Sequence, residues 1–273
     1  MKTSEEPKVG QELYHIRLKN GDIPRFVFLP GDPARVKLIA STWKDAKFVA
    51  ENREYLTYSG TYRGTKLAAT STGIGSGAMA IAIEELLRVG ADTFIRTGTT
   101  GALLKDLKVG SIIISTAAVR GDGATKAYVM PEYPAVANFE VILAAIEAAE
   151  KLQVDYTLGL TYSTDSFYLG QSRPGFRGYT SEYSRRILKE LADVKVVNME
   201  MESSTLFVLS SIYGVRAGSI FAVIANRANG EFEHKKGITN MIKVANETMH
   251  VLAQWDKLKE NDNKRYFYPS LLK

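Results

Sequence analysis

Residues 93–103 read TFIRTGTTGAL, and this stretch decides the fold class. A run of β-branched and aromatic residues, typical of a buried strand, reaches Arg96 and then gives way to GTTG at 98–101. We expect a strand over 93–97 and then a tight turn that presents one guanidinium, two hydroxyls and several free backbone N–H groups. Such a set suits a tetrahedral oxyanion, most simply phosphate, although an ordinary strand and turn with a surface Arg gives the same pattern.

Outward from this stretch, strands and helices alternate along the chain, a pattern typical of an α/β fold. No internal repeat, low-complexity tract or Pro/Ser-rich linker divides the sequence, so one domain over 1–273 is expected, with a flexible N-terminus at 1–10. Expected strands lie at 26–29, 55–62, 66–71, 93–97, 111–115, 157–163 and 217–225, and expected helices at 33–42, 78–89, 136–152, 181–192, 201–213 and 237–260.

Composition and charge narrow the class of function. The 273 residues are 45% hydrophobic, enough for a sizeable core, and include no cysteine. Disulfides, thiol nucleophiles and thiolate metal sites are therefore excluded, and a reducing cytoplasm is favoured. The three histidines lie far apart in the sequence and form no metal-binding spacing, so no metal centre is expected.

The net charge of +5 comes from scattered Lys and Arg residues. This pattern favours small anionic ligands, and no nucleic-acid partner is expected. The N-terminus is polar and lacks the apolar segment of a signal peptide, and no apolar run approaches the length of a membrane span. We therefore expect a cytoplasmic protein that does not bind membranes.

Two strand-to-helix turns carry further candidates for an anion site. GIGSG at 73–77 has the spacing GxGxG, whereas dinucleotide sites use GxGxxG, and the next strand ends in Arg96 where such sites need an acid. It predicts a phosphate cradle at a helix N-terminus or simply a tight turn. GDPAR at 31–35 predicts a helix capped by Asp32 with a solvated Arg35. Beside Arg96, at the carboxyl edge of one sheet, the same turn would form the second half of an anion pocket.

The segment NMEMES at 198–203 is expected to open a helix and carries two acids. Acids at a helix start stabilise the helix dipole, which is the simpler interpretation. Their i, i+2 spacing would place Glu200 and Glu202 on different faces, so that one faces a pocket while the other pairs elsewhere. A carboxylate accepts hydrogen bonds from sugar hydroxyls, so Glu202 is a candidate to hold a ribose and to stabilise cationic character at its anomeric carbon.

DSFYLGQSR at 165–173 lies in a long loop after an expected strand. Gln171 offers a paired donor and acceptor, Arg173 offers a fixed fork of donors, and Phe167 offers a face for stacking. Together these side chains suit a planar heterocycle. A solvated polar loop would have the same composition.

Taken in order, the blocks of this sequence resemble the nucleoside phosphorylase superfamily, most closely its bacterial-type uridine phosphorylases. The match covers roughly residues 14–255, and six ordered blocks are far more specific than any one of them. The resemblance implies a single-domain α/β fold with a central mixed, partly barrel-like β-sheet flanked by α-helices, and a hexamer built as a trimer of dimers. The six blocks are LPGDPARV (29–36), STGIGSGAMAIAIEELLRVG (71–90), FIRTGTTGAL (94–103), DSFYLGQSR (165–173), NMEMES (198–203) and RAGSIFAVIANR (216–227).

The resemblance also implies which residues contact each part of the substrates. The phosphate site falls on Gly31, Arg35, Arg96 and Thr99, with Arg53 from a neighbouring subunit. The ribose site falls on Met201 and Glu202, with His15 from a neighbouring subunit. The base site falls on Phe167, Gln171 and Arg173, and the residues with a catalytic role are Arg96, Glu202 and Arg173. Only the resemblance singles out His15 and Arg53, which the sequence alone would place on the surface.

The implied reaction is phosphorolysis of uridine to uracil and ribose 1-phosphate, with inorganic phosphate as co-substrate and no cofactor. Purine-specific members place an Asp after the strand equivalent to 217–225, to protonate the purine ring. Here Asn226 occupies that position and cannot deliver a proton, which favours a pyrimidine and phosphorolysis. The alternatives are a purine or broad-specificity nucleoside phosphorylase, and a non-catalytic sensor of nucleoside or phosphate.

Three departures from the family pattern bear on ligands. Some members bind a monovalent cation such as K⁺ between subunits through a Glu and a Ser. Glu54 matches the Glu, but Ala78 replaces the Ser, which argues against a cation here. Ala225 stands where a larger residue is usual and is expected to enlarge the base pocket. The segment 228–236, expected to form a mobile flap near the pocket, also differs in sequence.

Overall fold

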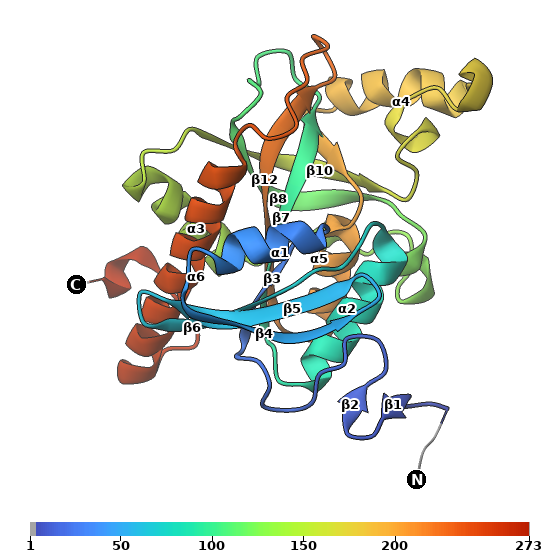
Figure 1. Ribbon diagram of the computed structural model, residues 1–273. Helices are drawn as coiled ribbons and strands as arrows, with labels where there is room; N and C mark the ends of the chain where they lie inside the picture. Colours follow the sequence, from blue (N-terminus) through green and yellow to red (C-terminus); the bar gives the residue numbers. More distant parts are fainter. Residues whose placement is uncertain (1–3, 273) are drawn as a thin grey trace.

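The structure is a computed structural model that describes residues 4–272. Within that range one mixed sheet of ten strands forms the centre, with helices on both faces, and a small ribbon of β1 (Lys8–Val9) and β2 (Glu12–Leu13) precedes it (Figure 1). The strands of the large sheet are β3 (Phe26–Leu29), β4 (Lys44–Asn52), β5 (Tyr55–Tyr62), β6 (Thr65–Thr70), β7 (Thr93–Ala102), β8 (Ile112–Gly121), β9 (Ala135–Val136), β10 (Tyr156–Thr164), β11 (Val196–Glu200) and β12 (Arg216–Asn226).

The helices form two layers because successive side chains of a strand point to opposite faces of the sheet. On β3, Phe28 packs into the core shared with α1, α3 and α6, whereas Val27 and Leu29 pack into the core shared with α2 and α5. In the described range, no helix is both long and apolar enough to cross a membrane. The helices are α1 (Pro33–Ala40), α2 (Ser76–Arg88), α3 (Phe139–Lys151), α4 (Glu182–Asp193), α5 (Ser203–Ile212) and α6 (Ile238–Asn261).

Half of the sheet closes on itself. The strand order is β11-β10-β8-β12-β7-β3-β6-β5-β4, and β9 pairs with β8. In addition β11 pairs with β7, so that β7, β12, β8, β10 and β11 form a ring of five strands. The predicted single-domain α/β fold with a mixed, partly barrel-like sheet is therefore confirmed.

Three parallel strands bring the predicted anion-binding segments to one edge of the sheet. The strands β6 and β7 both run parallel to β3, and Leu29 pairs with Arg96 in the register. The turns at 31–35 and 73–77 follow β3 and β6 directly. Because β3 and β6 end level with Arg96, both turns lie next to Arg96, as the sequence predicted.

The predicted turn after Arg96 is wrong, because β7 continues through GTTG to Ala102. The strand β12 pairs with it in parallel along its whole length, which keeps the backbone extended. A Cβ on Gly98 would lie 2.9 Å from Cδ1 of Phe221, so glycine is required here by close packing against the neighbouring strand. The backbone N–H groups that a turn would leave free therefore belong to a paired strand of the sheet.

Several strands and helix boundaries also differ from the expectation. The sequence analysis missed β4, whose mostly exposed residues lie at the edge of the sheet, and β11, in which the polar Asn198 and Glu200 alternate with apolar residues. It also missed the two-residue strands β1, β2 and β9. The helix expected from residue 201 begins at Ser203, since 196–200 form the strand instead. Of the predicted flexible N-terminus, residues 1–3 lie outside the described range, and β1 pairs with β2 within it.

Candidate active site

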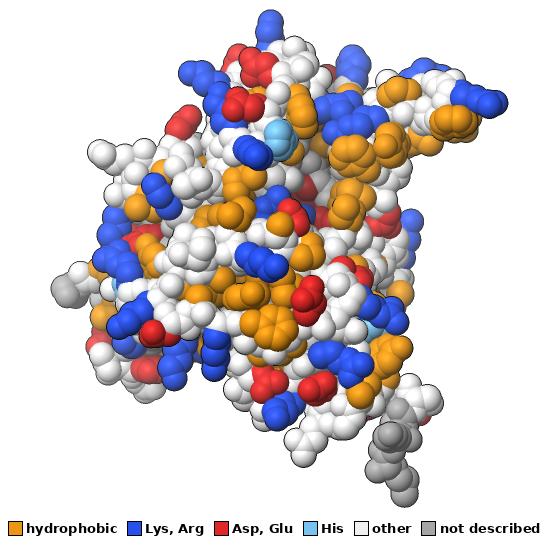
Figure 2. Space-filling model, in the orientation of Figure 1, with side chains coloured by type: hydrophobic (Ala, Val, Ile, Leu, Met, Phe, Trp, Pro, Cys, Tyr) orange, Lys and Arg blue, Asp and Glu red, His pale blue; other side chains and the backbone are white. Residues whose placement is uncertain are grey.

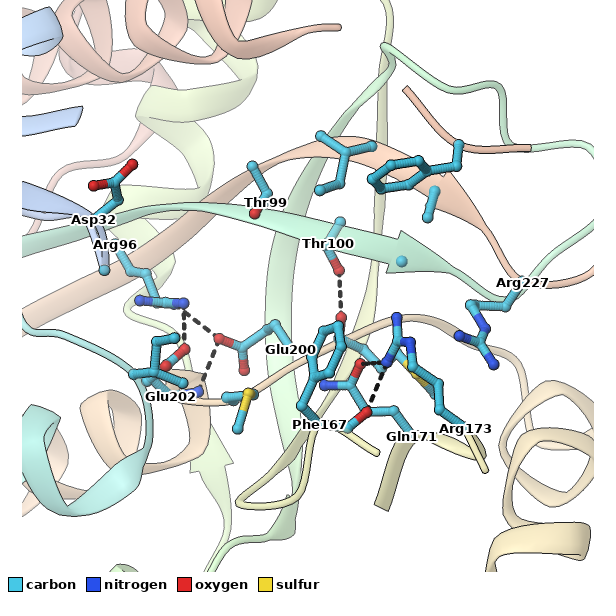
Figure 3. A pocket seen from close by; sticks show the side chains of 18 of the residues that line it. Asp32, Arg96, Thr99, Thr100, Phe167, Gln171, Arg173, Glu200, Glu202 and Arg227 are labelled. Atoms are coloured by element: carbon cyan, nitrogen blue, oxygen red, sulfur yellow. Dashed lines mark hydrogen bonds and ion pairs between the residues drawn. The ribbon is translucent and has the colours of Figure 1, made fainter. Parts of the chain in front are cut away.

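A cavity of about 1,010 Å³ opens at the carboxyl edge of β3, β7 and β12. Figure 2 shows its mouth as a hollow with hydrophobic side chains around it and charged side chains deeper inside. Figure 3 shows two groups of polar side chains, one around Arg96 and one around Arg173. Nine of the residues predicted from the sequence line this cavity, namely Gly31, Arg35, Arg96, Thr99, Phe167, Gln171, Arg173, Met201 and Glu202.

Arg96 is held between two carboxylates. Its Nε lies 2.8 Å from Oε2 of Glu200, and its Nη2 donates to Oε2 of Glu202. Burial would lower the pKa of Arg96, but the carboxylates of Glu202 and Glu200 outweigh it and raise that pKa. Its Nη1 is buried and has no hydrogen-bond partner among residues 4–272, so the side chain is fixed while one donor is left for a ligand.

Glu200 acts as a buried junction between strand and helix. One oxygen accepts from Oγ of Ser163 at 2.5 Å, and the carboxylate also accepts from the backbone N–H groups of Glu202 and Ser203, each at 2.9 Å. The predicted divergence of the two acids is wrong, because the chain leaves β11 at Glu200 and turns before α5 begins. Both carboxylates therefore converge on Arg96.

Glu202 is the carboxylate that faces the cavity from the end of this turn. Its Oε1 accepts from the backbone N–H of Gly75 at 2.6 Å, which fixes its position relative to the glycine-rich turn. Burial, opposed by Arg96 and reinforced by Glu200, raises the pKa of Glu202 to about 7. Because this turn donates to Glu202, that N–H group is not free to cradle a phosphate.

Arg35 supplies a second guanidinium at the same end of the cavity. Its Nη1 donates to the backbone oxygen of Thr97 at 3.4 Å, and Asp32 caps its helix by accepting from Ala34 N–H at 2.9 Å. Burial and the nearby Arg96 lower the pKa of Arg35. A Cβ on Gly31 would lie 2.9 Å from the backbone oxygen of Gly73, so only glycine lets the two turns approach this closely.

The two threonines of GTTG differ in their surroundings. The hydroxyl of Thr100 donates to the backbone oxygen of Met199 at 2.7 Å and accepts from Asn198 at 2.8 Å. Thr99 lines the cavity, and its hydroxyl has no hydrogen-bond partner among the described residues. The sequence predicted two hydroxyls for a ligand, and the structure leaves one.

The other end of the cavity is built around Arg173. Its guanidinium carbon lies 3.8 Å from the ring centre of Phe167, and its Nη1 donates to Oε1 of Gln171 at 2.6 Å and to the backbone oxygen of Phe167 at 2.8 Å. Ser172 between them has φ of 56°, a left-handed conformation at the end of a short 3₁₀ turn. The three residues that the sequence assigned to a planar heterocycle thus form one connected group.

Arg227 is a lining residue that the sequence analysis did not name as a contact. Its Nη2 donates to the backbone oxygen of Ser172 at 3.3 Å, and burial lowers its pKa. Burial and the charge of Arg227 together lower the pKa of Arg173 to about 10. Neither guanidinium forms an ion pair with a described carboxylate, so this end carries two uncompensated positive charges. The sequence signal that could have singled out Arg227 is its position as a second arginine at the end of the central strand β12.

Asn226 has a different environment from the one expected for a base contact. Its Nδ2 donates to the backbone oxygens of Leu104, Lys105 and Leu107 at 3.1, 3.3 and 2.7 Å, and its Oδ1 accepts from Ala228 N–H at 2.8 Å. All of these bonds are internal to the protein. The side chain therefore holds the end of β12 against a neighbouring loop and has no donor left for a ligand.

His15 and Arg53 do not line the cavity of their own chain. Nδ1 of His15 lies 2.7 Å from Oε1 of Glu85, and the guanidinium carbon of Arg53 lies 5.6 Å from the ring centre of Tyr14. The amide of Asn52 donates to the backbone oxygen of His15 at 2.7 Å, so the two predicted residues lie on one surface cluster. No group of three or more His, Asp or Glu side chains within residues 4–272 is placed to hold a metal ion.

Comparison with known proteins now gives the family. A model of the Phosphorylase superfamily matches residues 25–254. The chain belongs to this superfamily. It is 50% identical over 270 residues to a uridine phosphorylase of Thermococcus kodakarensis, which covers 98% of this chain and 97% of the relative. It is 37% identical over 223 residues to a uridine phosphorylase of Escherichia coli, covering 81% and 88%, and 38% identical over 216 residues to a guanosine phosphorylase of Halorubrum lacusprofundi, covering 79% and 84%.

Proposed function

We propose that this protein catalyses the phosphorolysis of uridine to uracil and ribose 1-phosphate. The observation that carries the proposal is the Arg173 group, in which Gln171 and Phe167 hold a planar fork of donors without a neutralising acid. This arrangement suits a flat heterocycle that leaves with negative charge. The names of the relatives from Thermococcus kodakarensis and Escherichia coli support the same substrate.

The chemistry requires positioning and charge rather than a proton donor to the base. Arg96 and Arg35, with the hydroxyl of Thr99, would hold phosphate and aim one of its oxygens at the anomeric carbon. The carboxylate of Glu202 would accept from a ribose hydroxyl and stabilise the cationic character that develops as the glycosidic bond breaks. Met201 lines the cavity beside it.

The negative charge of the breaking bond would move onto the leaving uracil. Arg173 would donate hydrogen bonds to that charge, and Gln171 would donate and accept at the edge of the base. The reaction then balances: the phosphate oxygen forms the new bond to carbon, and the base takes the electron pair of the old one. The proton of the attacking hydrogen phosphate passes through water to the released base, which gives neutral uracil. Inorganic phosphate is the co-substrate in this scheme, and no further cofactor enters it.

The site of each subunit would be completed by a neighbour. His15 and Arg53 are absent from the lining of their own cavity and lie together on a separate surface. We propose that they reach the cavity of a second copy, within a hexamer built as a trimer of dimers, and that the enzyme works in the cytoplasm in pyrimidine salvage. A mixture of Arg53→Ala and Arg96→Ala subunits, refolded together, should regain activity that neither variant has alone.

Release of uracil from uridine, measured with and without phosphate, tests the proposed reaction. Phosphorolysis requires release only when phosphate is present, together with equal amounts of uracil and ribose 1-phosphate. Arg96→Ala should abolish the phosphate-dependent release of uracil and serves as the control for a contaminating enzyme. Equal release without phosphate would indicate hydrolysis, and binding without any release would indicate a sensor.

A purine substrate is the second candidate, favoured by one relative and one residue. The relative is the guanosine phosphorylase of Halorubrum lacusprofundi. The residue is Ala225, whose small side chain lines the cavity and whose backbone pairs with Phe232. Turnover of inosine or guanosine above that of uridine would establish this alternative.

A further inference from the structure

His15 lies on the surface of its own chain, but its imidazole is not free to rotate. Nδ1 lies 2.7 Å from Oε1 of Glu85, and the same carboxylate accepts from the backbone N–H of His15 at 3.1 Å and from that of Ile16 at 2.9 Å. Glu85 itself is 7% exposed on α2, whose neighbouring residues are packed in the core. One hydrogen bond thus ties the imidazole to a rigid helix, and two more tie the backbone on either side of it to the same carboxylate.

This contact fixes the protonation of the neutral ring. An ionised carboxylate can only accept, so the nitrogen that faces it must carry the proton. The other nitrogen, Nε2, has no hydrogen-bond partner among the described residues and then presents a lone pair. A lone pair accepts a hydrogen bond from a hydroxyl and cannot donate one to an anion.

The ring is also held from its other sides. Tyr14 packs edge-on against it with ring centres 4.9 Å apart, and Tyr55 lies 6.5 Å away. The backbone oxygen of His15 accepts from Asn52, the residue before Arg53. The surface cluster therefore presents one oriented acceptor and one guanidinium on a common support.

We propose that Glu85 is a positioning residue, which holds His15 in the Nδ1–H tautomer so that Nε2 accepts a hydrogen bond from a ribose hydroxyl of the nucleoside in the neighbouring copy's cavity. The inference rests on the proposed function, because the hydroxyl belongs to the substrate of that reaction. It adds a residue that touches neither substrate and acts only through His15. Glu84, the preceding residue of α2, pairs with Arg88 and with Tyr213 and provides a matched control.

The tautomer is tested first, on the whole protein. The chain has three histidines, so labelling them with ¹⁵N and removing one with His15→Leu assigns the signals of the ring. In the original protein we expect a protonated Nδ1 and an unprotonated Nε2 at a pH where the ring is neutral. Glu85→Gln should mix the tautomers, and Glu84→Gln should not. A protonated Nε2 in the original protein would overturn the proposal.

Kinetics then test whether the tautomer matters. Glu85→Gln should lower kcat/KM for uridine by about tenfold, the size of one lost hydrogen bond, mainly through KM. If Glu85 acts through His15, the same change should cause no further loss in a His15→Leu background. A purely structural role would instead multiply the two losses and overturn the proposal. The measurement is repeated with 2′-, 3′- and 5′-deoxyuridine. For the analogue that lacks the hydroxyl contacted by His15, Glu85→Gln and the original enzyme should have the same kcat/KM.

A second variant keeps the test open if Glu85→Gln fails to fold. The amide of His15→Gln can donate to Glu85 and present an oxygen in place of Nε2, whereas His15→Leu can do neither. We expect the Gln variant to retain clearly more activity than the Leu variant, and equal activity would overturn the proposal. If the original protein does not phosphorolyse uridine, the proposed function fails, and the tautomer measurement still decides whether Glu85 orients His15.

Discussion

Removal of the Arg173 guanidinium should slow the reaction in proportion to the charge on the leaving base. The group makes two hydrogen bonds within its loop, stacks on Phe167 and has no acid partner, so a negative base would be its counter-charge. One charged hydrogen bond contributes about 1.5–3 kcal/mol, which corresponds to a loss of roughly 10- to 150-fold in kcat/KM for uridine on Arg173→Ala. Arg173→Lys keeps the charge but loses the planar fork, so its loss should be smaller.

The assay is a leaving-group series. Initial rates are measured for uridine and for 5-fluorouridine, whose base is a weaker base once released and needs less stabilisation. Arg173→Ala should slow uridine clearly more than 5-fluorouridine, and added guanidinium ion should restore part of the loss. Equal losses for both substrates, with no rescue, would show that the guanidinium only organises the loop. An equal loss for inosine would show that it does not recognise a pyrimidine.

Three further predictions concern buried groups. Glu200→Ala leaves Arg96 with one carboxylate, so the free energy of unfolding should fall by about 3–5 kcal/mol and calorimetry should show Tm lower by roughly 10 °C; an unchanged Tm would contradict the junction role. Because the pKa of Glu202 is raised to about 7 and its ionised form is the active one, kcat/KM for uridine should fall as pH drops below about 7, a limb that Glu202→Gln should lack. Asn226→Asp points a carboxylate at three carbonyl oxygens, so urea unfolding should show about 2–3 kcal/mol of destabilisation, and any large gain in inosine turnover would refute the structural role.

The sequence predicted the architecture well where the spacing of apolar residues, or a single capping or turn residue, decides the local structure. Most helices and buried strands follow from apolar patterning, and Asp32 caps its helix through Ala34 N–H as expected. The edge strand β4 could not be found this way, because an exposed strand has no buried face to impose alternation. At GTTG the local preference for a turn was overridden by pairing with β12 and by the contact of Gly98 with Phe221.

The candidate site, like the fold, could be predicted from the sequence only in part. Nine of the residues predicted from the motifs line one cavity, because loops that follow parallel strands share an edge of the sheet. Motif spacing could not predict that Glu200 and Glu202 both contact Arg96, since this depends on where β11 stops and α5 starts. It also could not predict that the donors of Asn226 are occupied by three carbonyl oxygens far away in the sequence.

The two ends of the cavity differ in charge balance, and this difference agrees with the direction in which charge moves in the proposed reaction. Around Arg96 two carboxylates offset the charge of the guanidinium. Around Arg173 and Arg227 no carboxylate offsets the charge, and burial makes both guanidinium charges costly. A base that becomes negative as its bond breaks relieves that cost, and a neutral nucleoside does not. In the proposed reaction the arginine pair would therefore stabilise the transition state more than the bound substrate, which is the condition for catalysis.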